Sequence, residues 1–411
     1  MIETTYKIDI NKLKIVPDIK KQDKNKLELC FYGILPDEIK EWIDHHQIKT
    51  YKIEQYTNII IDDHHQLSDL FNVNEPYQFM DGFSPNLNKH LHIGHFSNFV
   101  FAKAFNSLGL CKYTVSIYGD TLPGEVTKKE ALDKLDFYFD NFGYHPNIRT
   151  YASEMRLTND NILSDGEDNY AGCKIFNVGD QKIVGIKSDG STSYFYQDVS
   201  LAQILNSHRT LYLTGKEQEN HFQLFKILFP NITHLPLGLV KVNSKKMGTR
   251  FGNVIYIDTL LQEIKDEVGG DASLELIYNI FAGFILRTTP ESDKNINLDS
   301  LTNVKNSPGF YISYTMARLH SAGVFDEYIA DKNISTKFEN KELEYLHLRS
   351  YNDLKPNLLF DGLINLCNEI NHLYSNHHIR GNQKNIEMFG KLLSDLMIGC
   401  EKLGLFYITK V

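Results

Sequence analysis

The stretch SPNLNKHLHIGH, residues 84–95, lies between a predicted strand and a predicted helix. The preceding residues, YQFMDGF, have the composition of a strand, and the apolar residues from His92 to Leu108 recur at helical spacing. Three histidines, one lysine and one glycine fall within seven residues of this stretch. A metal site, a phosphate site and an ordinary helix start are the three explanations for such polar chemistry at the end of a strand.

Strands and helices continue to alternate downstream. Thr127 and Glu130 have the spacing of a capping box, which predicts a helix that continues to Phe142. Two more helices are predicted to begin near Gln197 and Glu217. The further predicted strands are YTVSIYG, QKIVGIKS, RTLYLTG and ITHLPLGLV. This alternation predicts an α/β fold with a doubly wound, Rossmann-like parallel sheet.

The pattern predicts three domains. Residues 1–76 alternate short apolar and charged stretches, which predicts a small N-terminal α/β unit. Residues 77–258 hold the alternating strands and helices and form the predicted doubly wound domain. Residues 259–411 have helical apolar spacing and no strand signal, which predicts an α-helical bundle.

Composition narrows the class of protein. An apolar fraction of 42% is typical of a soluble globular protein, and a net charge of -9 does not suggest a strongly basic nucleic-acid binder. A local basic patch can still bind RNA. Apolar runs are too short to span a bilayer, and no signal peptide is recognised. The five cysteines are scattered, without a zinc-type pair, which predicts reduced thiols in a cytoplasmic protein.

The metal hypothesis has limited support. His92 and His95 are three residues apart and could share one helical face as ligands, but no Cys, Asp or Glu lies at a supporting distance in the sequence. An ordinary helix start with solvent-facing histidines is the other simple interpretation. Two more polar clusters have weaker claims: DDHH at 62–65 is expected at a loop and helix start, and NHHIR at 376–380 at a helix end.

A phosphate site explains more of the stretch. Doubly wound sheets bind ligands beyond the carboxyl ends of their strands, and a helix that begins there offers free N–H groups to an anion. His92 and His95 on the first turn can donate to phosphate oxygens, and Gly94 lets a flat base approach the backbone. The sequence HIGH at 92–95 therefore predicts a site for a nucleoside triphosphate.

A second stretch, VNSKKMGTRFGNVIYID at 242–258, supports this prediction. Its Gly-rich basic loop could place Lys246 over the same phosphates, where a lysine stabilises charge on a transferring phosphoryl group. The alternative is a solvated basic turn that contains Lys245, Lys246 and Arg250.

Together, the two stretches resemble the HIGH motif and the KMSKS loop of class I aminoacyl-tRNA synthetases. Further matches resemble arginyl-tRNA synthetases in particular. Ser84, Pro85, Asn86 and Lys89 match that family's Ser-Pro-Asn and lysine before the HIGH motif. The loop Met247–Asn253 matches Met-Ser-Thr-Arg-x-Gly-Asn, with glycine in place of serine. The other matching segments are SYFYQDVSLAQ, LYLTGKEQENHFQLFKIL and NSPGFYISYTMARLHS.

The resemblance implies how ATP and its phosphate-bound Mg²⁺ are held. The phosphates would lie at His92 and His95, and the adenine near Gly94. The family often lacks the second lysine of the KMSKS loop, here Thr249, and Lys89 takes the place of the lysine thought to compensate for it. The residues implied in catalysis are Lys89, His92, His95 and Lys246. The residues implied in ATP binding are these four with Gly94, Met247, Thr249 and Arg250.

The resemblance also implies an arginine site, since a guanidinium group requires carboxylates in matching geometry. Asp81, Tyr194 and Asp198 match positions at which the family binds the guanidinium group, with Asp81 replacing the expected Glu. Ser84, Asn86 and Gln218 match positions near the α-amino group. Asp198 could instead cap a helix, and Asn86 could cap the helix that carries the HIGH motif.

Several features depart from the family pattern. Full-length members are usually considerably longer, and their N-terminal domain would be compressed here into about 76 residues. Gly119 and Asp120 of a Gly-Asp-Trp-Gly motif are kept, but the tryptophan is absent. Residues 321–411 hold 10 Lys and Arg against 12 Asp and Glu, so the bundle shows no basic excess for reading tRNA.

The implied function is ATP-dependent activation of L-arginine to arginyl-AMP and transfer of the arginyl group to tRNA by a monomeric cytoplasmic ligase. One alternative is a paralogue that transfers arginine to a small-molecule or peptide amine without tRNA. Another is a non-catalytic tRNA-binding relative, against which the intact HIGH motif, Lys246 and arginine-site residues argue.

Overall fold

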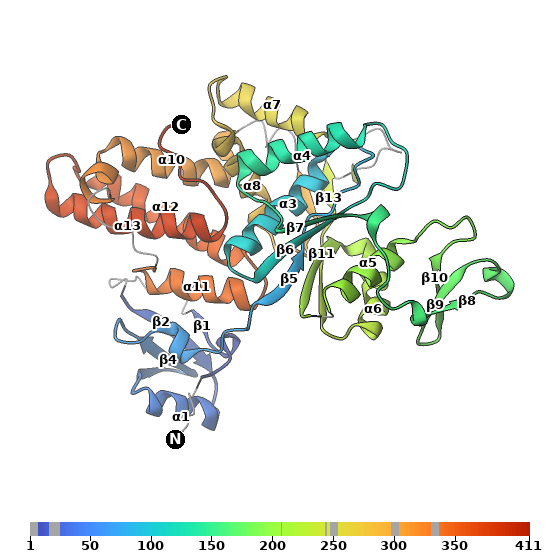
Figure 1. Ribbon diagram of the computed structural model, residues 1–411. Helices are drawn as coiled ribbons and strands as arrows, with labels where there is room; N and C mark the ends of the chain where they lie inside the picture. Colours follow the sequence, from blue (N-terminus) through green and yellow to red (C-terminus); the bar gives the residue numbers. More distant parts are fainter. Residues whose placement is uncertain are drawn as a thin grey trace. The chain divides into compact units, whose positions relative to one another are not determined.

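The computed structural model describes residues 7–15, 25–206, 208–242, 245–246, 254–296, 304–329 and 337–411. The chain forms two compact units (Figure 1). One unit combines Met1–Glu75 with Lys305–Val411, and the other is Pro76–Val304. The division at residue 258 into a catalytic domain and a bundle stays a prediction.

The unit Pro76–Val304 is built on a five-stranded parallel sheet in the order β12-β11-β5-β6-β7. The chain runs outward from β5 in both directions, so right-handed connections place α3 and α4 on one side of the sheet and α5 and α6 on the other (Figure 1). This confirms the predicted Rossmann-like fold. The strands are β5 Tyr77–Asp81, β6 Cys111–Tyr118, β7 Ile148–Tyr151, β11 Thr210–Gly215 and β12 Ile232–Leu237. The helices are α3 Ile93–Ser107, α4 Lys128–Phe142, α5 Tyr194–Ile204 and α6 Glu219–Leu228.

One predicted strand of the parallel sheet belongs elsewhere. Gln181–Ile186 forms β10 of a separate antiparallel sheet, ordered β10-β9-β8. The turn at Gly179, which has a positive φ of 58°, joins β9 and β10 as a hairpin, and such a short connection permits only antiparallel pairing. The partner strands are β8 Leu163–Asp165 and β9 Lys174–Val178.

The last part of this unit covers helix α3. Helix α8 is almost entirely apolar, and its Phe281 stacks on Phe96 of α3 with ring centroids 4.8 Å apart. Residues before α7 and after α8 form a small sheet in the order β14-β13-β15. The strands of this sheet are β13 Val240–Val242, β14 Lys245–Lys246 and β15 Lys294–Ile296. The two helices are α7 Ile257–Val268 and α8 Leu274–Leu286.

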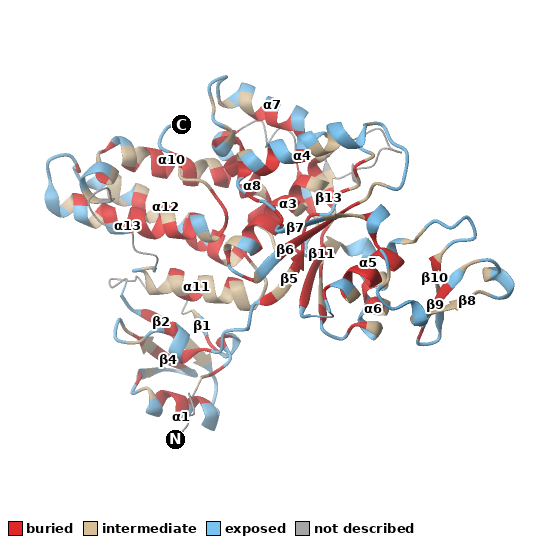
Figure 2. Ribbon diagram, viewed as in Figure 1, coloured by how far each residue is buried: buried red, intermediate tan, exposed pale blue. Residues whose placement is uncertain are grey.

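The other unit joins an antiparallel sheet, in the order β1-β2-β4-β3, to a helical bundle. The predicted helices of the bundle are confirmed. The sheet region comprises β1 Lys14–Ile15, β2 Leu27–Tyr32, α1 Asp37–His45, β3 Lys49–Ile53, β4 Tyr56–Ile61 and α2 Leu67–Leu70. The bundle comprises α10 Pro308–Ser321, α11 Lys341–Asn352, α12 Asn357–Asn376 and α13 Gln383–Lys402. Figure 2 shows buried residues in red along α12 and α13 and on the central strands of the parallel sheet.

A tyrosine of the bundle completes the core of the N-terminal sheet region. Tyr345 of α11 is fully buried with Ile10, Leu13 and Phe71, and its hydroxyl donates to the carbonyl oxygens of Ile10 and Leu13 at 3.0 and 2.8 Å. The helical packing and the sheet packing therefore depend on each other, although Tyr345 lies 335 and 332 positions from Ile10 and Leu13 in the chain.

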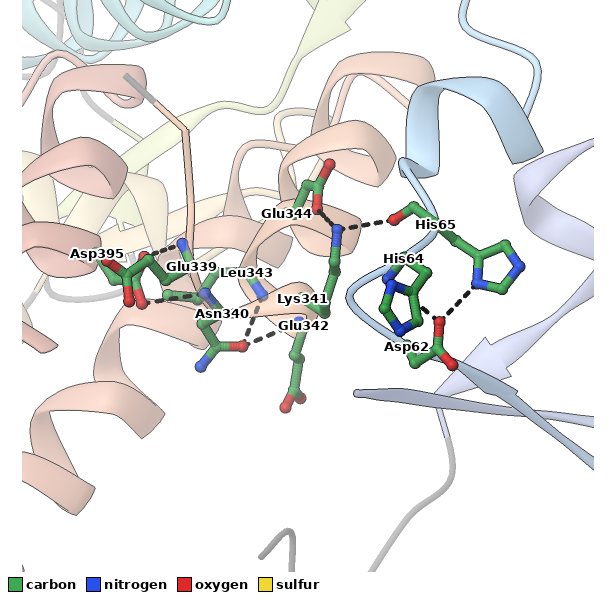
Figure 3. A network of polar contacts seen from close by, with 10 residues as sticks. All are labelled: Asp62, His64, His65, Glu339, Asn340, Lys341, Glu342, Leu343, Glu344 and Asp395. Carbon is green, nitrogen blue, oxygen red and sulfur yellow. Dashed lines mark hydrogen bonds and ion pairs between the residues drawn. The ribbon is translucent and has the colours of Figure 1, made fainter. Parts of the chain in front are cut away.

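Polar contacts hold the same two parts together (Figure 3). The buried Asp395 carboxylate accepts the backbone N–H of Asn340, and the Asn340 side chain caps α11. Lys341 in the first turn donates to the carbonyl oxygen of His65 at 3.0 Å, and the His65 ring bonds Asp62 at 2.8 Å. The DDHH cluster thus forms a loop that contacts the start of α11.

Candidate active site

A cavity of about 420 Å³ opens at the carboxyl ends of the parallel strands. It lies where the order of the sheet reverses, between β5 and β11, which is where doubly wound folds bind ligands. Its walls are the loop after β5, the start of α3, the 3-10 turn Lys216–Gln218 after β11, and the segment after β12. Predicted site residues that line it are Asp81, Ser84, Asn86, His92, Gly94, His95 and Gln218.

The two histidines of the HIGH motif cap helix α3. Nδ1 of His92 accepts the N–H of Gly94 at 3.1 Å, and Nδ1 of His95 accepts the N–H of His92 at 3.2 Å. A nitrogen that accepts carries no proton, so each neutral ring has its proton on Nε2. Burial lowers the pKa of His95 to about 3 and that of His92 below its usual value, and the nearby Lys89 charge adds to both effects. The motif is therefore both a helix start and a pair of neutral donors.

Glycines make the close packing of this region possible. A Cβ on Gly82, directly after β5, would lie 2.8 Å from Cβ of Ala102 in α3. A Cβ on Gly119, at the end of β6, would lie 1.8 Å from Oδ1 of Asn86. Leu87 donates its N–H to the Gly119 carbonyl oxygen at 2.7 Å. These approaches fix the loop that carries Asn86; this residue does not cap α3, since His92 does.

Asp81 is a buried carboxyl at the end of β5, with 6% of its surface exposed. The Ser84 hydroxyl donates to Asp81 at 2.5 Å and accepts the N–H of Ile117 in β6. Burial, with added repulsion from Asp198, raises the pKa of Asp81 to about 7. Since the desolvated carboxylate has no cationic partner among the described residues, a cation that enters here would stabilise its charged form.

Asp198 lies inside helix α5 rather than at its start, because Ser193 caps that helix. Its carboxylate contacts Nε2 of His221 in α6 at 2.7 Å, which fixes its orientation. Tyr194 begins α5 and is 59% exposed. Neither Tyr194 nor Asp198 lines the 420 Å³ cavity, but Asp198 is close enough to act electrostatically on Asp81.

Tyr212 is a polar group that sequence reasoning did not identify. It pairs with Asp81 in the parallel register of β11 and β5 and is 1% exposed. Its hydroxyl has no hydrogen-bond partner among the described residues, and Asp198 and Asp81 both act on its pKa, which burial raises well above the usual value. A tyrosine within an apolar strand gives no sequence signal, because strand cores commonly contain this residue.

Lys89 lines a neighbouring cavity of about 380 Å³ instead of the first one. The two cavities share Asn86, and the Lys89 charge still lowers the pKa values of His92 and His95. Lys246 forms β14 with Lys245 and pairs with Lys241 in β13. The predicted ATP-site residues Met247, Thr249 and Arg250 lie outside the described residues.

Another cavity, of about 600 Å³, lies in the helical bundle. The Arg318 guanidinium stacks on the Tyr374 ring at 3.7 Å and donates to Asn371, and Arg380 donates to the carbonyl oxygen of Ser321. No Asp or Glu side chain is among the described residues that line it. Its polar and aromatic lining residues are Tyr314, Arg318, Ser321, Tyr374, His377, His378, Arg380 and Lys410.

Neither a metal centre nor a membrane span is found in the part of the chain that the structure describes. No three His, Cys, Asp or Glu residues are grouped around a possible ion there. Among those residues, no helix is long and apolar enough to cross a membrane.

The chain resembles known proteins in sequence. It is 24% identical over 326 residues to an arginine–tRNA ligase of Oenococcus oeni, which covers 67% of this chain and 56% of that protein. It is 26% identical to an arginine–tRNA ligase of Clostridium perfringens, covering 60% of this chain and 50% of that protein. The chain thus matches about half the length of these relatives. No family model matches it.

Solved structures extend the likeness to the fold. The arginyl-tRNA synthetase of Thermus thermophilus superposes with a TM-score of 0.62 at 14% identity, over 97% of this chain and 96% of that one. The arginyl-tRNA synthetase of Plasmodium falciparum gives a TM-score of 0.57 at 15% identity, over 88% of this chain and 86% of that one. In sequence over about two thirds of its length, and in fold over most of it, the chain is therefore arginyl-tRNA synthetase-like.

Proposed function

We propose that the chain activates L-arginine with ATP, forms arginyl-AMP and pyrophosphate, and transfers the arginyl group to tRNA. One observation carries this proposal: a single cavity at the sheet's reversal point contains both the neutral histidine donors of α3 and the buried Asp81 carboxyl. The first group suits phosphate oxygens, and the second suits a cation.

The activation step needs positioning and charge stabilisation more than covalent chemistry. A carboxylate oxygen of arginine attacks the α-phosphorus of ATP, and the bond from that phosphorus to the bridging oxygen breaks as pyrophosphate leaves with the electron pair. In the proposal, Nε2 of His92 and His95 donates to phosphate oxygens, and Lys89 and Lys246 stabilise the developing charge. Mg²⁺ would be held through the phosphates of ATP, as this ion commonly is.

Arginine recognition is proposed to rest on the carboxylates. The guanidinium group would pair with Asp81 and Asp198, which restores to Asp81 the charge that burial disfavours. Tyr194 would lie beside this group. Ser84, Asn86 and Gln218 would lie near the α-amino end, and each of these three lines the cavity.

The bundle cavity supports tRNA as the acceptor. Single-stranded RNA binds to surfaces that combine aromatic rings for stacking with cations for phosphate. The Arg318–Tyr374 stack, Arg380 and Lys410 provide this combination. A small amine acceptor would have no use for such a surface, so tRNA is the favoured acceptor.

Arginine-dependent ATP–pyrophosphate exchange tests the proposal. It should be measured for all amino acids, with and without tRNA, because many arginyl enzymes require tRNA for activation. Exchange with arginine alone among the amino acids is expected, together with charged tRNA as the product. An absence of arginine-dependent exchange in both arms would refute arginine activation. Exchange without any charged tRNA would support transfer to another amine.

A cytoplasmic location and a monomeric state are proposed as well. The five cysteines are free thiols, which supports the reducing environment of the cytoplasm. A monomer is proposed, and sedimentation of the purified protein at several concentrations tests it, since a mass that rises with concentration contradicts a monomer.

A further inference from the structure

The carboxylate of Asp293 connects two walls of the active-site cavity. Asp293 lies between α8 and β15, and its Oδ1 accepts hydrogen bonds from Nζ of Lys216 and from the N–H of Leu239, the latter at 3.1 Å. Its Oδ2 pairs with Nζ of Lys241 at 2.8 Å. Lys216 begins the turn after β11, whereas Leu239 and Lys241 belong to the segment after β12.

The backbones of the same segments are in direct contact. Gly238 donates its N–H to the carbonyl oxygen of Pro290 at 2.9 Å, and Lys294 donates its N–H to that of Leu239 at 2.9 Å. A Cβ on Gly238 would lie 2.0 Å from the carbonyl oxygen of Ser292, so only glycine fits this approach. The segment after β12 is therefore held along the segment that contains Asp293.

The next residue anchors this arrangement to helix α3. Lys294 is 3% exposed, and its ammonium group donates to the carbonyl oxygens of Thr289, Pro290 and Ser292. It also lies over the Phe101 ring of α3, 4.7 Å from the centroid. The loop that carries Asp293 is thus closed around a buried cation and rests on the helix that His92 and His95 cap.

We infer that Asp293 is a positioning residue that sets the spacing between the two cavity walls formed by residues 215–218 and 237–240. Gly215, Glu217 and Gln218 line the cavity on one side, and Leu237–Val240 line it on the other. Asp293 itself does not line it. The expected effect on ATP binding rests on the proposed function, whereas the expected effect on the spacing of the two walls does not.

The charge of Asp293 explains why the two walls stay together. Hydrogen bonds from Lys216 and Lys241 hold the pKa of this carboxyl well below its usual range, so it remains ionised at neutral pH. Without that charge, the two ammonium groups would repel each other and the Leu239 N–H would keep only a weaker, neutral acceptor. Each change separates the walls, and small displacements of positioning groups have large effects on rate.

Asp293→Asn tests the inference, with Glu291→Gln as the matched control. Glu291 is an exposed acid in the same loop, outside the cavity and with no bond to either wall. We expect Asp293→Asn to weaken ATP binding about tenfold and to affect arginine binding less, because Asp81 and Asp198 lie on other elements. Its thermal midpoint should stay close to that of the original protein, since ion pairs as exposed as these contribute little to stability.

Amide hydrogen exchange provides a measurement that does not depend on activity. Asp293→Asn should speed exchange in both 215–218 and 237–241, and Glu291→Gln should not. Should Asp293→Asn fail to fold, the double variant Lys216→Met with Lys241→Met removes both lysine ion pairs to Asp293 and is expected to speed exchange in the same two walls.

The outcomes separate the inference from the proposed function. Faster exchange in both walls, in a protein that binds no ATP even without substitution, would uphold the positioning role and refute the proposed function. Unchanged exchange would overturn the inference, as would ATP and arginine binding that fall equally together with the thermal midpoint. The latter pattern would indicate a role in folding alone.

Discussion

Two cavities among the described residues have opposite chemistry: the 420 Å³ cavity, here the first, and the 600 Å³ bundle cavity, here the second. The cavity beyond the parallel strands contains the buried Asp81 carboxyl, and the bundle cavity is lined by Arg318, Arg380 and Lys410 without an acidic side chain among its described residues. Both are assembled from three separate segments of the chain: 81–98, 213–218 and 237–240 for the first, and 314–322, 374–380 and 410–411 for the second. A chain with a net charge of -9 can thus present a basic site, because local arrangement and not total charge determines what a surface binds.

The largest effect is expected from Lys89→Ala, which should slow the activation of arginine in the first cavity and leave the second cavity unchanged. Removing one charge-stabilising donor should raise the activation barrier by about 3 kcal/mol. Pyrophosphate exchange measures this, and RNA affinity should not change. Lys129→Ala is the control, because Lys129 is exposed on α4 and lines neither cavity. A near-normal exchange rate would refute the compensating role of Lys89.

Asp198→Asn should weaken arginine binding by about 2 kcal/mol, since a charge-assisted pair with the guanidinium would be lost. ATP binding should stay the same, because the histidine donors are unaffected. Isothermal titration with each ligand separately measures both effects. Asp189→Asn, an exposed change in the loop before α5, is the control. Equal losses for ATP and arginine would contradict a specific guanidinium contact.

The pH dependence of arginine binding should distinguish the first cavity from the second. The pKa of Asp81 is raised to about 7, so the carboxyl is protonated below that pH and cannot pair with a guanidinium. Arginine affinity should therefore rise up to about tenfold between pH 6 and pH 8. In the absence of ligand, the same carboxyl affects the free energy of unfolding in the opposite direction: the folded protein becomes less stable as pH rises towards 7. Asp81→Asn should bind arginine weakly and without this dependence, and a flat profile for the unsubstituted protein would contradict the assignment.

The smallest effect is expected in the second cavity. Arg318→Gln should weaken tRNA binding by about 1 kcal/mol. It should also reduce the slope of log affinity against log salt concentration by about one. Filter binding across a salt series measures both quantities. Lys391→Gln, an exposed change on α13 outside the cavity, should do neither. Unchanged binding by Arg318→Gln would remove this cavity from the RNA surface.

One wall of the first cavity, formed by residues 81–98, could be predicted from sequence because its residues are close in the chain. A strand end, a tight loop and a helix start within about 20 residues brought Asp81, Ser84, Asn86, His92 and His95 together, as local geometry requires. The histidines' second role, as the cap of α3, was only one of three alternatives until their Nδ1 acceptors were located. The parallel, doubly wound sheet followed from the same alternation, whereas the order of its strands did not.

What sequence reasoning missed depends on distant contacts. The count of charges over residues 321–411 showed no basic excess, since it could not reveal which residues of three segments gather around one cavity. Asp293 carries no motif, and its lysine partners lie 77 and 52 positions away. Strand β10 was assigned to the wrong sheet, because its apolar composition does not distinguish a hairpin from a parallel strand.

The burial of Tyr345 in the N-terminal sheet region has a consequence for synthesis. Its hydroxyl bonds Ile10 across 335 residues, so the ribosome makes α11 long after the segment that Tyr345 covers. At about 5–20 residues per second, the apolar face around Ile10 and Phe71 stays without this cover for roughly 20–70 seconds. The parallel-sheet unit, which is complete in the chain before residue 305, can fold during that interval. The segment around Ile10 and Phe71 therefore emerges long before it reaches its final packing, and it is exposed to aggregation or to chaperones during the interval.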